Sequence, residues 1–205
     1  SNDPDKIDPV IEIGITPNRP DALGVYGIAR DLYAKGLGKL IPRKIGEIYS
    51  TFESPVDVVL DNSVSKKDCP YFLGRYIKGI NNSSSPDWLQ NRLIKIGLRP
   101  ISGLVDLTNF LTFDSARPLH AFDADRLEGD LVVRKAKNGE ELKALDGNVY
   151  KLDDTMTVIA DSKCVQAIGG IIGGENSGCS ESTKNIFIES AYFDPISTAK
   201  TGRKL

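Results

Sequence analysis

The stretch Leu131-Val132-Val133-Arg134-Lys135 begins a run of short β-forming segments, and this run decides the fold class. Asn138-Gly139 and Asp146-Gly147 lie between these segments and are typical of tight hairpin turns. Each segment is rich in β-branched or apolar residues and only four to eight residues long, as expected of strands. The strands predicted in this half of the chain are 131–135, 142–145, 149–152, 156–160, 165–172 and 185–191.

Helical spacing appears nearer the middle of the chain. Ser85-Pro86-Asp87 is typical of a helix start, with Ser85 as N-cap and a proline at the first position. The predicted helix runs to Gly97, and Trp88 is expected to anchor it in the core. A second helix is predicted over 101–112, where apolar residues recur at spacings of three and four.

The N-terminal segment predicts a strand, a rigid turn and a helix. Residues 10–15 alternate as a strand does, and the two prolines within 16–20 force an extended turn. Asn18 and Arg19 in that turn either fix its geometry or face a ligand. A helix is then expected from Ala22 to Tyr33, followed by Gly36 at the C-cap position.

The order of these elements predicts an α+β fold, because helices come early and strands accumulate later. Two further strands are predicted over 56–60 and 71–80, before the first helix start of the middle segment. We expect a mixed or antiparallel β-rich core with flanking helices. The expected organisation is a small α/β-type domain over residues 1–40, a linker over 41–55, and a larger domain over 56–205.

Bulk composition excludes several classes of protein. The net charge of −2 and pI near 5.5 indicate no global basic field for non-specific RNA binding, although a small site for a nucleic-acid end remains open. No apolar run reaches the roughly 18 residues of a membrane span. The three scattered cysteines give neither a disulfide framework nor a zinc motif, so no metal is expected and a reducing cytoplasm fits. The two ends predict a piece of a longer chain.

His120 is the only histidine, and it lies in Arg117-Pro118-Leu119-His120-Ala121-Phe122-Asp123. No other side chain has an ordinary pKa near neutrality, about 6.5, so proton transfer near pH 7 has one natural candidate. A lone histidine in an apolar run is also compatible with a packed structural residue. Thr108 and Asn109, toward the end of the second predicted helix, either face a polar cavity or bond the local backbone.

Glu189 and a glycine-rich stretch complete the candidate site. Glu189 alternates with apolar residues on both faces of its predicted strand, which indicates a buried carboxyl group. It either caps backbone N–H groups or recognises a polar ligand atom. The glycine-rich residues 167–175 match neither a P-loop nor a dinucleotide-binding fingerprint, so we exclude nucleotide binding there. Paired glycines instead predict unusual backbone or a close ligand, and their N–H groups could hold an oxyanion.

Several stretches together resemble the β subunit of bacterial phenylalanyl-tRNA synthetase. They occur in the family's order and spacing, and are Ile15-Thr16-Pro17-Asn18-Arg19-Pro20-Asp21, Gly27-Ile28-Ala29-Arg30-Asp31, Val105-Asp106-Leu107-Thr108-Asn109-Phe110, Pro118-Leu119-His120-Ala121-Phe122-Asp123, Gly170-Ile171-Ile172-Gly173-Gly174-Glu175 and Glu189-Ser190-Ala191-Tyr192-Phe193. The resemblance implies that residues 1–40 end a small B1-like domain. It also implies that the remainder is the B3/B4 editing domain, which hydrolyses tyrosine wrongly attached to tRNA(Phe).

The resemblance also implies roles for individual residues. His120, Asn109 and Thr108 match the family's catalytic residues around the hydrolytic water. Glu189 matches the acid that accepts the tyrosine hydroxyl, and Gly170 and Gly173 match glycines of the pocket wall. Gly103 and Gly169 depart from the family's usual residues, and a further Thr-Asp-Ala-Ser stretch is expected beyond Leu205.

For the intact enzyme, the resemblance implies a cytoplasmic heterotetramer of two α and two β subunits that binds tRNA. ATP and Mg²⁺ would serve the synthetic site on the α subunit, and no cofactor is expected in this fragment. A different class of function stays open, in which the chain is a non-catalytic scaffold that guides tRNA and assembles the subunits.

Overall fold

The computed structural model describes residues 9–205, which form two compact units. Unit 1 contains the described residues 9–45 together with Ser84–Pro118. Unit 2 contains Gly46–Ser83 and Leu119–Leu205. Each unit therefore joins two segments that are distant in sequence. The domain boundaries proposed from the sequence remain a prediction.

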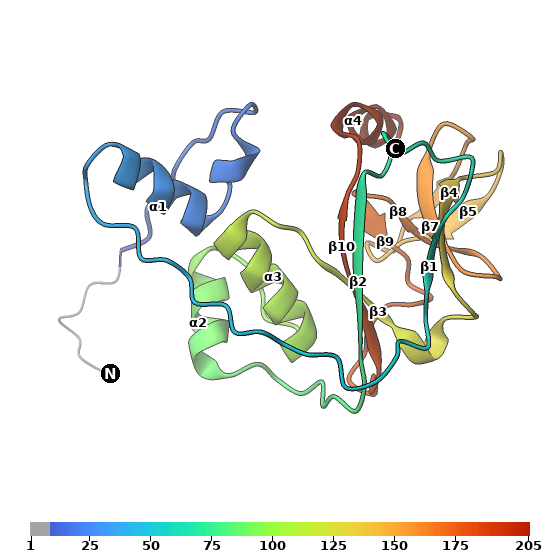
Figure 1. The fold of residues 1–205 in the computed structure, drawn as a ribbon, viewed down its shortest axis with the longest axis horizontal. Helices are drawn as coiled ribbons and strands as arrows, with labels where there is room; N and C mark the ends of the chain where they lie inside the picture. Colours follow the sequence, from blue (N-terminus) through green and yellow to red (C-terminus); the bar gives the residue numbers. More distant parts are fainter. Residues whose placement is uncertain (1–8) are drawn as a thin grey trace. The chain divides into compact units, whose positions relative to one another are not determined.

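Unit 1 is helical (Figure 1). It contains the 3₁₀ helix η1 (Pro20–Ala22) and the α-helices α1 (Val25–Ala34), α2 (Asp87–Lys95) and α3 (Gly103–Ser115). The three helices predicted from sequence are confirmed. Gly36 and Gly97 follow α1 and α2 with φ values of 75° and 83°, the left-handed conformation that ends helices.

Two predictions at the start of α2 are wrong. Pro86, not Ser85, is the N-cap residue, because the Ser85 hydroxyl donates to the buried Asp106 carboxylate instead. Trp88 does not anchor the core, since 53% of it is exposed. Leu89 and Leu93, four residues apart on the other side of the helix, are the buried ones.

The strand predicted over 10–15 is also wrong. The described residues up to the turn at 17 have no regular structure, and Val10, Ile11 and Ile13 are exposed. A strand requires a neighbour to satisfy its backbone hydrogen bonds, and no described segment pairs with this one. The alternation of apolar residues over 10–15 is therefore not enough to make this segment a strand.

Unit 2 is built around two main sheets and confirms the α+β class. A five-stranded sheet has the order β1 (Val58–Leu60), β4 (Leu131–Lys135), β7 (Thr157–Ala160), β8 (Val165–Ile168) and β9 (Ile172–Gly173). Its β1–β4 pair is parallel and the other pairs are antiparallel, so the sheet is mixed.

A three-stranded antiparallel sheet has the order β2 (Tyr71–Ile77), β10 (Ile186–Tyr192) and β3 (His120–Asp123) (Figure 1). β5 (Glu141–Lys143) and β6 (Val149–Lys151) form a separate hairpin. Phe122 and Phe187 of the three-stranded sheet share one hydrophobic cluster with Leu131, Ile159 and Ala167 of the five-stranded sheet. One face of β10 and β3 is therefore turned into the core of unit 2.

The structure adds and divides elements in the second half of the chain. The strand predicted over 165–172 is split into β8 and β9 by a turn at Gly169-Gly170. Three elements were not predicted: β3, the 3₁₀ helix η2 (Ala124–Arg126) and α4 (Pro195–Lys204). The start of α4 did carry a signal, because Asp194 caps it by accepting a hydrogen bond from the Ser197 N–H, and Pro195 follows.

Candidate functional site

The three-stranded sheet places the two strongest candidate residues side by side. Glu189 on β10 lies directly opposite His120 on β3, and directly opposite Gly74 on β2. Residues directly opposed on neighbouring strands share one face of a sheet. The next pair on this face is Phe187 and Phe122, both in the core. His120 and Glu189 are thus neighbours on the inward face.

His120 is enclosed on the side of its Nε2 atom. The residue as a whole is half-buried, but Nε2 is buried and has no hydrogen-bond partner among the described residues. Phe122 meets the imidazole edge to face, with ring centroids 4.4 Å apart. Burial penalises the charged imidazolium and lowers the pKa of His120 from 6.5 to about 4. The ring is therefore neutral at physiological pH.

Gly173 on β9 gives the imidazole its room. A Cβ atom built on Gly173 would lie 2.2 Å from His120 Cε1 and 2.7 Å from Nε2. Both distances are far inside van der Waals contact, so any larger residue at 173 would displace the ring or the strand. The glycine predicted to shape the pocket wall is in direct contact with the candidate catalytic ring.

Glu189 is a buried carboxyl group without a donor. Only 7% of the residue is exposed, and its carboxylate accepts no hydrogen bond within the described part of the chain. Burial raises the pKa of Glu189 from 4.5 to about 7. Such a group is costly in the folded protein unless a ligand supplies a partner. The alternative that Glu189 caps backbone N–H groups finds no support in the structure.

Gly74 contributes to the same surroundings and was not predicted. A Cβ on Gly74 would lie 2.1 Å from Cζ of Phe187, so the phenylalanine ring occupies the space that a side chain at 74 would need. Phe187 is buried and lies two residues before Glu189 on the same face. A glycine inside a strand is the sequence signal for such a close approach.

The glycine-rich loop offers fewer free N–H groups than its sequence indicated. The N–H groups of Gly169, Ile171 and Gly174 donate to Thr157 O, Ile168 O and Gln166 O, and that of Glu175 donates to Lys143 O. These four N–H groups already donate to backbone carbonyl groups and are not available to an oxyanion. Gly170 has a φ of 71° and lies near Phe193, whose Cδ2 would be 3.1 Å from an added Cβ. Its contacts thus differ from those of Gly173.

Thr108 and Asn109 lie on α3 and belong to unit 1, whereas His120, Glu189, Gly170 and Gly173 belong to unit 2. The Thr108 hydroxyl donates to the carbonyl of Val105 at 2.9 Å, which is the local backbone bond that the sequence left open. Asn109 is half-buried. The structure therefore brings together His120, Glu189 and Gly173 in unit 2. Thr108 and Asn109 belong to unit 1.

Comparison with known proteins places this geometry in a family. A family model described as the B3/4 domain matches residues 68–205, more than half of the chain. The chain belongs to the B3/4 domain family. Phenylalanine–tRNA ligase β subunits of Paramagnetospirillum magneticum and Mesorhizobium japonicum are 54% and 56% identical over 97% of this chain. The resemblance to phenylalanyl-tRNA synthetase β subunits is confirmed.

The chain spans about a quarter of the length of these relatives, with 25% and 24% of their sequences aligned. A crystal structure of an N-terminal fragment of the phenylalanyl-tRNA synthetase β subunit from Pyrococcus horikoshii has a similar fold, with a TM-score of 0.53. It is 19% identical, and the match covers 88% of this chain and 54% of the fragment. All six site residues predicted from the sequence lie inside the B3/4 match.

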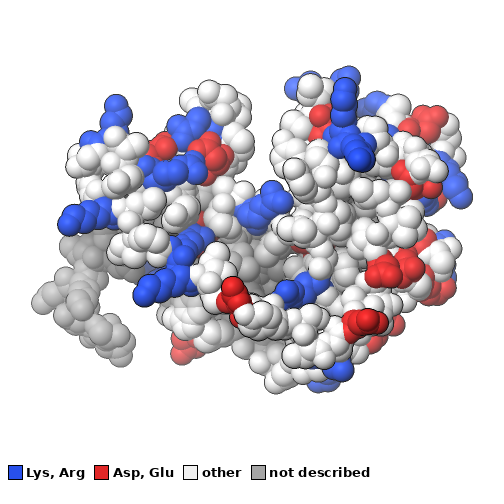
Figure 2. Space-filling view, in the orientation of Figure 1, with Lys and Arg blue, Asp and Glu red and all other residues white. Residues whose placement is uncertain are grey.

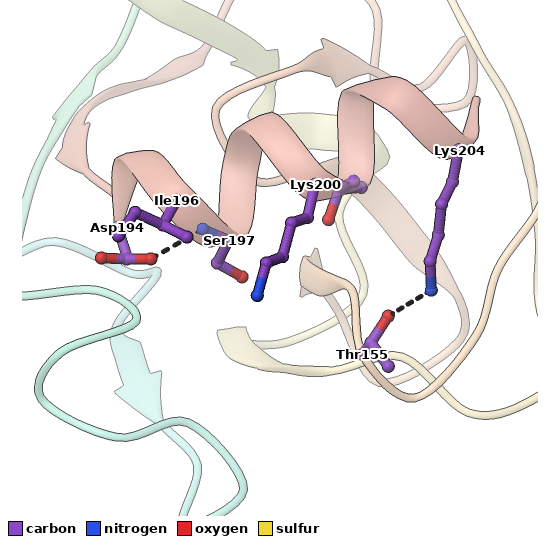
Figure 3. Close-up of a pocket in the computed structure, with 7 residues that line it drawn as sticks. Thr155, Asp194, Ile196, Ser197, Lys200 and Lys204 are labelled. Atoms are coloured by element: carbon purple, nitrogen blue, oxygen red, sulfur yellow. Dashed lines mark hydrogen bonds between the residues drawn. The ribbon is translucent and has the colours of Figure 1, made fainter.

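A pocket in unit 2 lies at α4, and none of the predicted site residues lines it (Figure 3). Its volume is about 320 Å³. Lys204 donates from one wall to Thr155 and Asp153, while Asp194 is occupied as the cap of α4. Lys200 also lines this pocket. Because its one carboxylate and one of its two ammonium groups are already paired, the pocket offers no catalytic arrangement.

None of the described His, Cys, Asp and Glu side chains gather in groups of three or more that could hold a metal ion. No described helix combines the length and hydrophobicity that a transmembrane segment requires.

Proposed function

We propose that this chain is the editing part of a phenylalanine–tRNA ligase β subunit, and that it hydrolyses tyrosine wrongly esterified to tRNA(Phe). The observation that carries the proposal is the cross-strand pair of His120, whose buried Nε2 has no partner among the described residues, and the buried carboxyl group of Glu189. The B3/4 match and the names of the relatives support it.

The whole enzyme forms the context of this proposal. We place the chain in a cytoplasmic heterotetramer of two α and two β subunits, with tRNA(Phe) as the nucleic-acid partner. ATP and Mg²⁺ would serve aminoacylation at a site on the α subunit. The names of the relatives, which are ligase β subunits, support this setting.

Glu189 would select tyrosine over phenylalanine. A phenolic hydroxyl can donate to the carboxylate, or accept from the carboxylic acid, so it pairs with Glu189 in either protonation state. Phenylalanine has no such group and would leave a buried carboxyl unpaired, which costs roughly 1–3 kcal/mol or more. Sites that use a substrate hydroxyl in this way discriminate by roughly 10⁴-fold, whereas a pocket for phenylalanine rejects the added hydroxyl only about 10²-fold.

His120 would position the water that attacks the ester. Its lowered pKa keeps the ring neutral, so a nitrogen lone pair can accept a hydrogen bond from water. A ring with a pKa of about 4 is a weak base, which favours orienting the water over removing its proton beforehand. In this proposal Asn109 and Thr108 assist the placement of water, and Gly173 and Gly170 shape the wall of the pocket.

The first test measures hydrolysis of tyrosyl-tRNA(Phe) and phenylalanyl-tRNA(Phe) by the chain and its variants. Glu189→Ala should abolish most of the preference for the tyrosyl ester, because no carboxyl group remains to form a hydrogen bond with the tyrosine hydroxyl. His120→Ala should slow both esters by about 10²-fold or more, as expected when a positioned acid–base group is lost. The matched control is Glu141→Ala, an exposed glutamate on β5.

The outcomes separate the proposal from its alternative. A Glu189→Ala variant that keeps the full tyrosine preference would show that another residue selects the substrate. A chain that binds tRNA(Phe) but hydrolyses neither ester, even within the complete heterotetramer, would favour the non-catalytic scaffold.

A further inference from the structure

The chain's net charge of −2 conceals an uneven distribution between its two units. The described residues of unit 1 include ten Lys or Arg and six Asp or Glu. Unit 2 has the opposite balance, with fifteen basic and nineteen acidic residues. Blue side chains gather accordingly over the part of Figure 2 that contains α1, α2 and α3. Unit 1 can therefore attract a polyanion although the chain as a whole is acidic.

An aromatic and cationic surface lies on α2 and α3 within this unit. Trp88 is 53% exposed and meets Phe110 edge to face, with ring centroids 5.6 Å apart. The guanidinium of Arg92 lies 5.8 Å from the Trp88 ring centroid and 6.0 Å from that of Phe110. Lys95 follows Trp88 and Arg92 at helical spacing, on the same side of α2.

The carboxylates of unit 1 leave this surface positive. Arg92 forms no ion pair with a described residue, and its guanidinium lies near the two rings. Most acidic groups of the unit are engaged elsewhere: Asp21 and Asp31 pair with Arg19, Asp114 pairs with Arg43, and Asp106 is buried against Ser85 and the Ile101 N–H. On α2 itself the one acidic residue is Asp87, in the first turn.

We propose that the Trp88–Phe110–Arg92 surface binds an unpaired RNA strand, with a base stacked on the indole and a phosphate held by the guanidinium. The choice of RNA as the physiological ligand rests on the proposed function, whereas the surface itself does not. Single-stranded RNA is recognised by stacking on aromatic rings and guanidinium planes, combined with cations along the backbone. Trp88 and Arg92 of α2 and Phe110 of α3 bring these groups together on one surface.

Exposed Trp and Arg side chains also occur at the centre of protein–protein interfaces, so a protein is the competing partner for this surface. A protein interface places such residues inside a desolvated patch ringed by polar groups. Here Arg92 lies against the tryptophan and forms no ion pair with a described residue, so its charge would remain unpaired beneath an apolar partner. A phosphate backbone supplies the missing negative charge. Charge complementarity therefore favours RNA.

The test uses the chain's own fluorescence, because Trp88 is the only tryptophan among 205 residues. A short single-stranded RNA oligonucleotide is titrated into the chain while the indole emission is recorded. Stacking of a base should quench the emission in a saturable manner. The logarithm of the affinity should also fall with the logarithm of the salt concentration, by about 0.7 per phosphate contacted. A duplex of the same sequence should quench much less, because its bases are already stacked.

Variants are measured by the anisotropy of the same RNA carrying a fluorescent label. Trp88→Ala should weaken binding about tenfold, and Trp88→Phe should restore most of the loss because it keeps a stacking ring. Arg92→Ala should weaken binding and reduce the salt dependence by about one phosphate contact. The matched control is Arg203→Ala, an exposed arginine on α4 in unit 2, which should leave the affinity unchanged.

Three outcomes would overturn the proposal. RNA binding that leaves Trp88 emission unchanged would place the RNA elsewhere on the chain. Equal losses in the Arg92→Ala and Arg203→Ala variants would reduce the effect to general charge. An indole that is shielded in the complete heterotetramer, and indifferent to RNA, would show that a protein surface covers it. Because the RNA carries no esterified amino acid, these results do not depend on ester hydrolysis. Failure of the editing proposal would be seen separately, in the hydrolysis assay.

Discussion

Glu189 makes the stability of the fold depend on pH in a predictable direction. Its pKa is about 7 in the folded chain and 4.5 when unfolded, so the unfolded state releases the proton more readily. The penalty for burying this carboxyl is absent below pH 4.5 and grows as the pH rises towards 7. At 1.36 kcal/mol per pKa unit, it reaches about 3 kcal/mol above pH 7.

Glu189→Gln should therefore change stability only in neutral and alkaline solution. The variant should match the wild type near pH 4.5 and exceed it by about 3 kcal/mol above pH 7, because the amide cannot ionise. Urea unfolding across this range measures the difference. Glu141→Gln, at an exposed site, should show no such trend. A difference that stays constant with pH would mean that Glu189 finds a partner in solution.

Gly173 controls the position of the His120 ring. Gly173→Ala places a methyl group 2.2 Å from Cε1 of the imidazole, so the ring must move toward solvent. We expect a loss of about 1–3 kcal/mol in stability, as for other overpacked sites. The pKa of His120 should also rise from about 4 towards 6.5. Since His120 is the only histidine, NMR titration of its ring resonances reports this value directly.

The control for this variant is Gly202→Ala on α4, where an added Cβ meets nothing within 4 Å. It should leave the His120 titration unchanged. An unaltered pKa in Gly173→Ala would contradict the close contact between β9 and the imidazole.

At the scale of elements, Asp106 ties the start of α2 to α3. This buried carboxylate accepts hydrogen bonds from the Ser85 hydroxyl and from the Ile101 N–H, the latter at 2.8 Å. Asp106→Ala would leave the buried Ser85 hydroxyl without its acceptor and would remove the bond from the Ile101 N–H, and we expect a cost of about 2–3 kcal/mol. Trp88 fluorescence during urea unfolding measures it, because Trp88 lies on α2. Asp87→Ala, at an exposed position, should cost less than half as much.

The same contact explains why the sequence misassigned the beginning of α2. Ser85-Pro86-Asp87 has the composition of an N-cap, and the helix does begin there. The serine hydroxyl nevertheless bonds a carboxylate 21 residues away instead of a nearby N–H. Local propensity predicted the element, and a long-range hydrogen bond decided which residue caps it.

At the scale of the molecule, the two units have very different cores. Both hydrophobic clusters consist of unit 2 residues. In the described part of unit 1, the buried apolar side chains are Ala22, Leu89 and Leu93. Burial of apolar surface is the main favourable contribution to folding, so unit 1 should be the less stable.

We therefore expect two unfolding transitions in urea. Trp88 fluorescence should follow unit 1 at lower denaturant, and hydrogen exchange of the β7 amides should follow unit 2 at higher denaturant. The single tryptophan makes the first signal specific. Coincident midpoints would mean that the units unfold as one cooperative body.

The sequence by itself determined the α+β class, three helices and most strands of unit 2, because hydrophobic periodicity and turn residues act locally. It also indicated His120 and Glu189, one as the only histidine and one as a carboxyl in an apolar strand. The tertiary structure decided what these residues face. Strand pairing placed Glu189 opposite His120, and the packing of β9 put Gly173 against the imidazole. Tertiary packing also left Trp88 exposed, and residues 10–15 have no partner strand among the described residues, since register and burial depend on segments that no local pattern specifies.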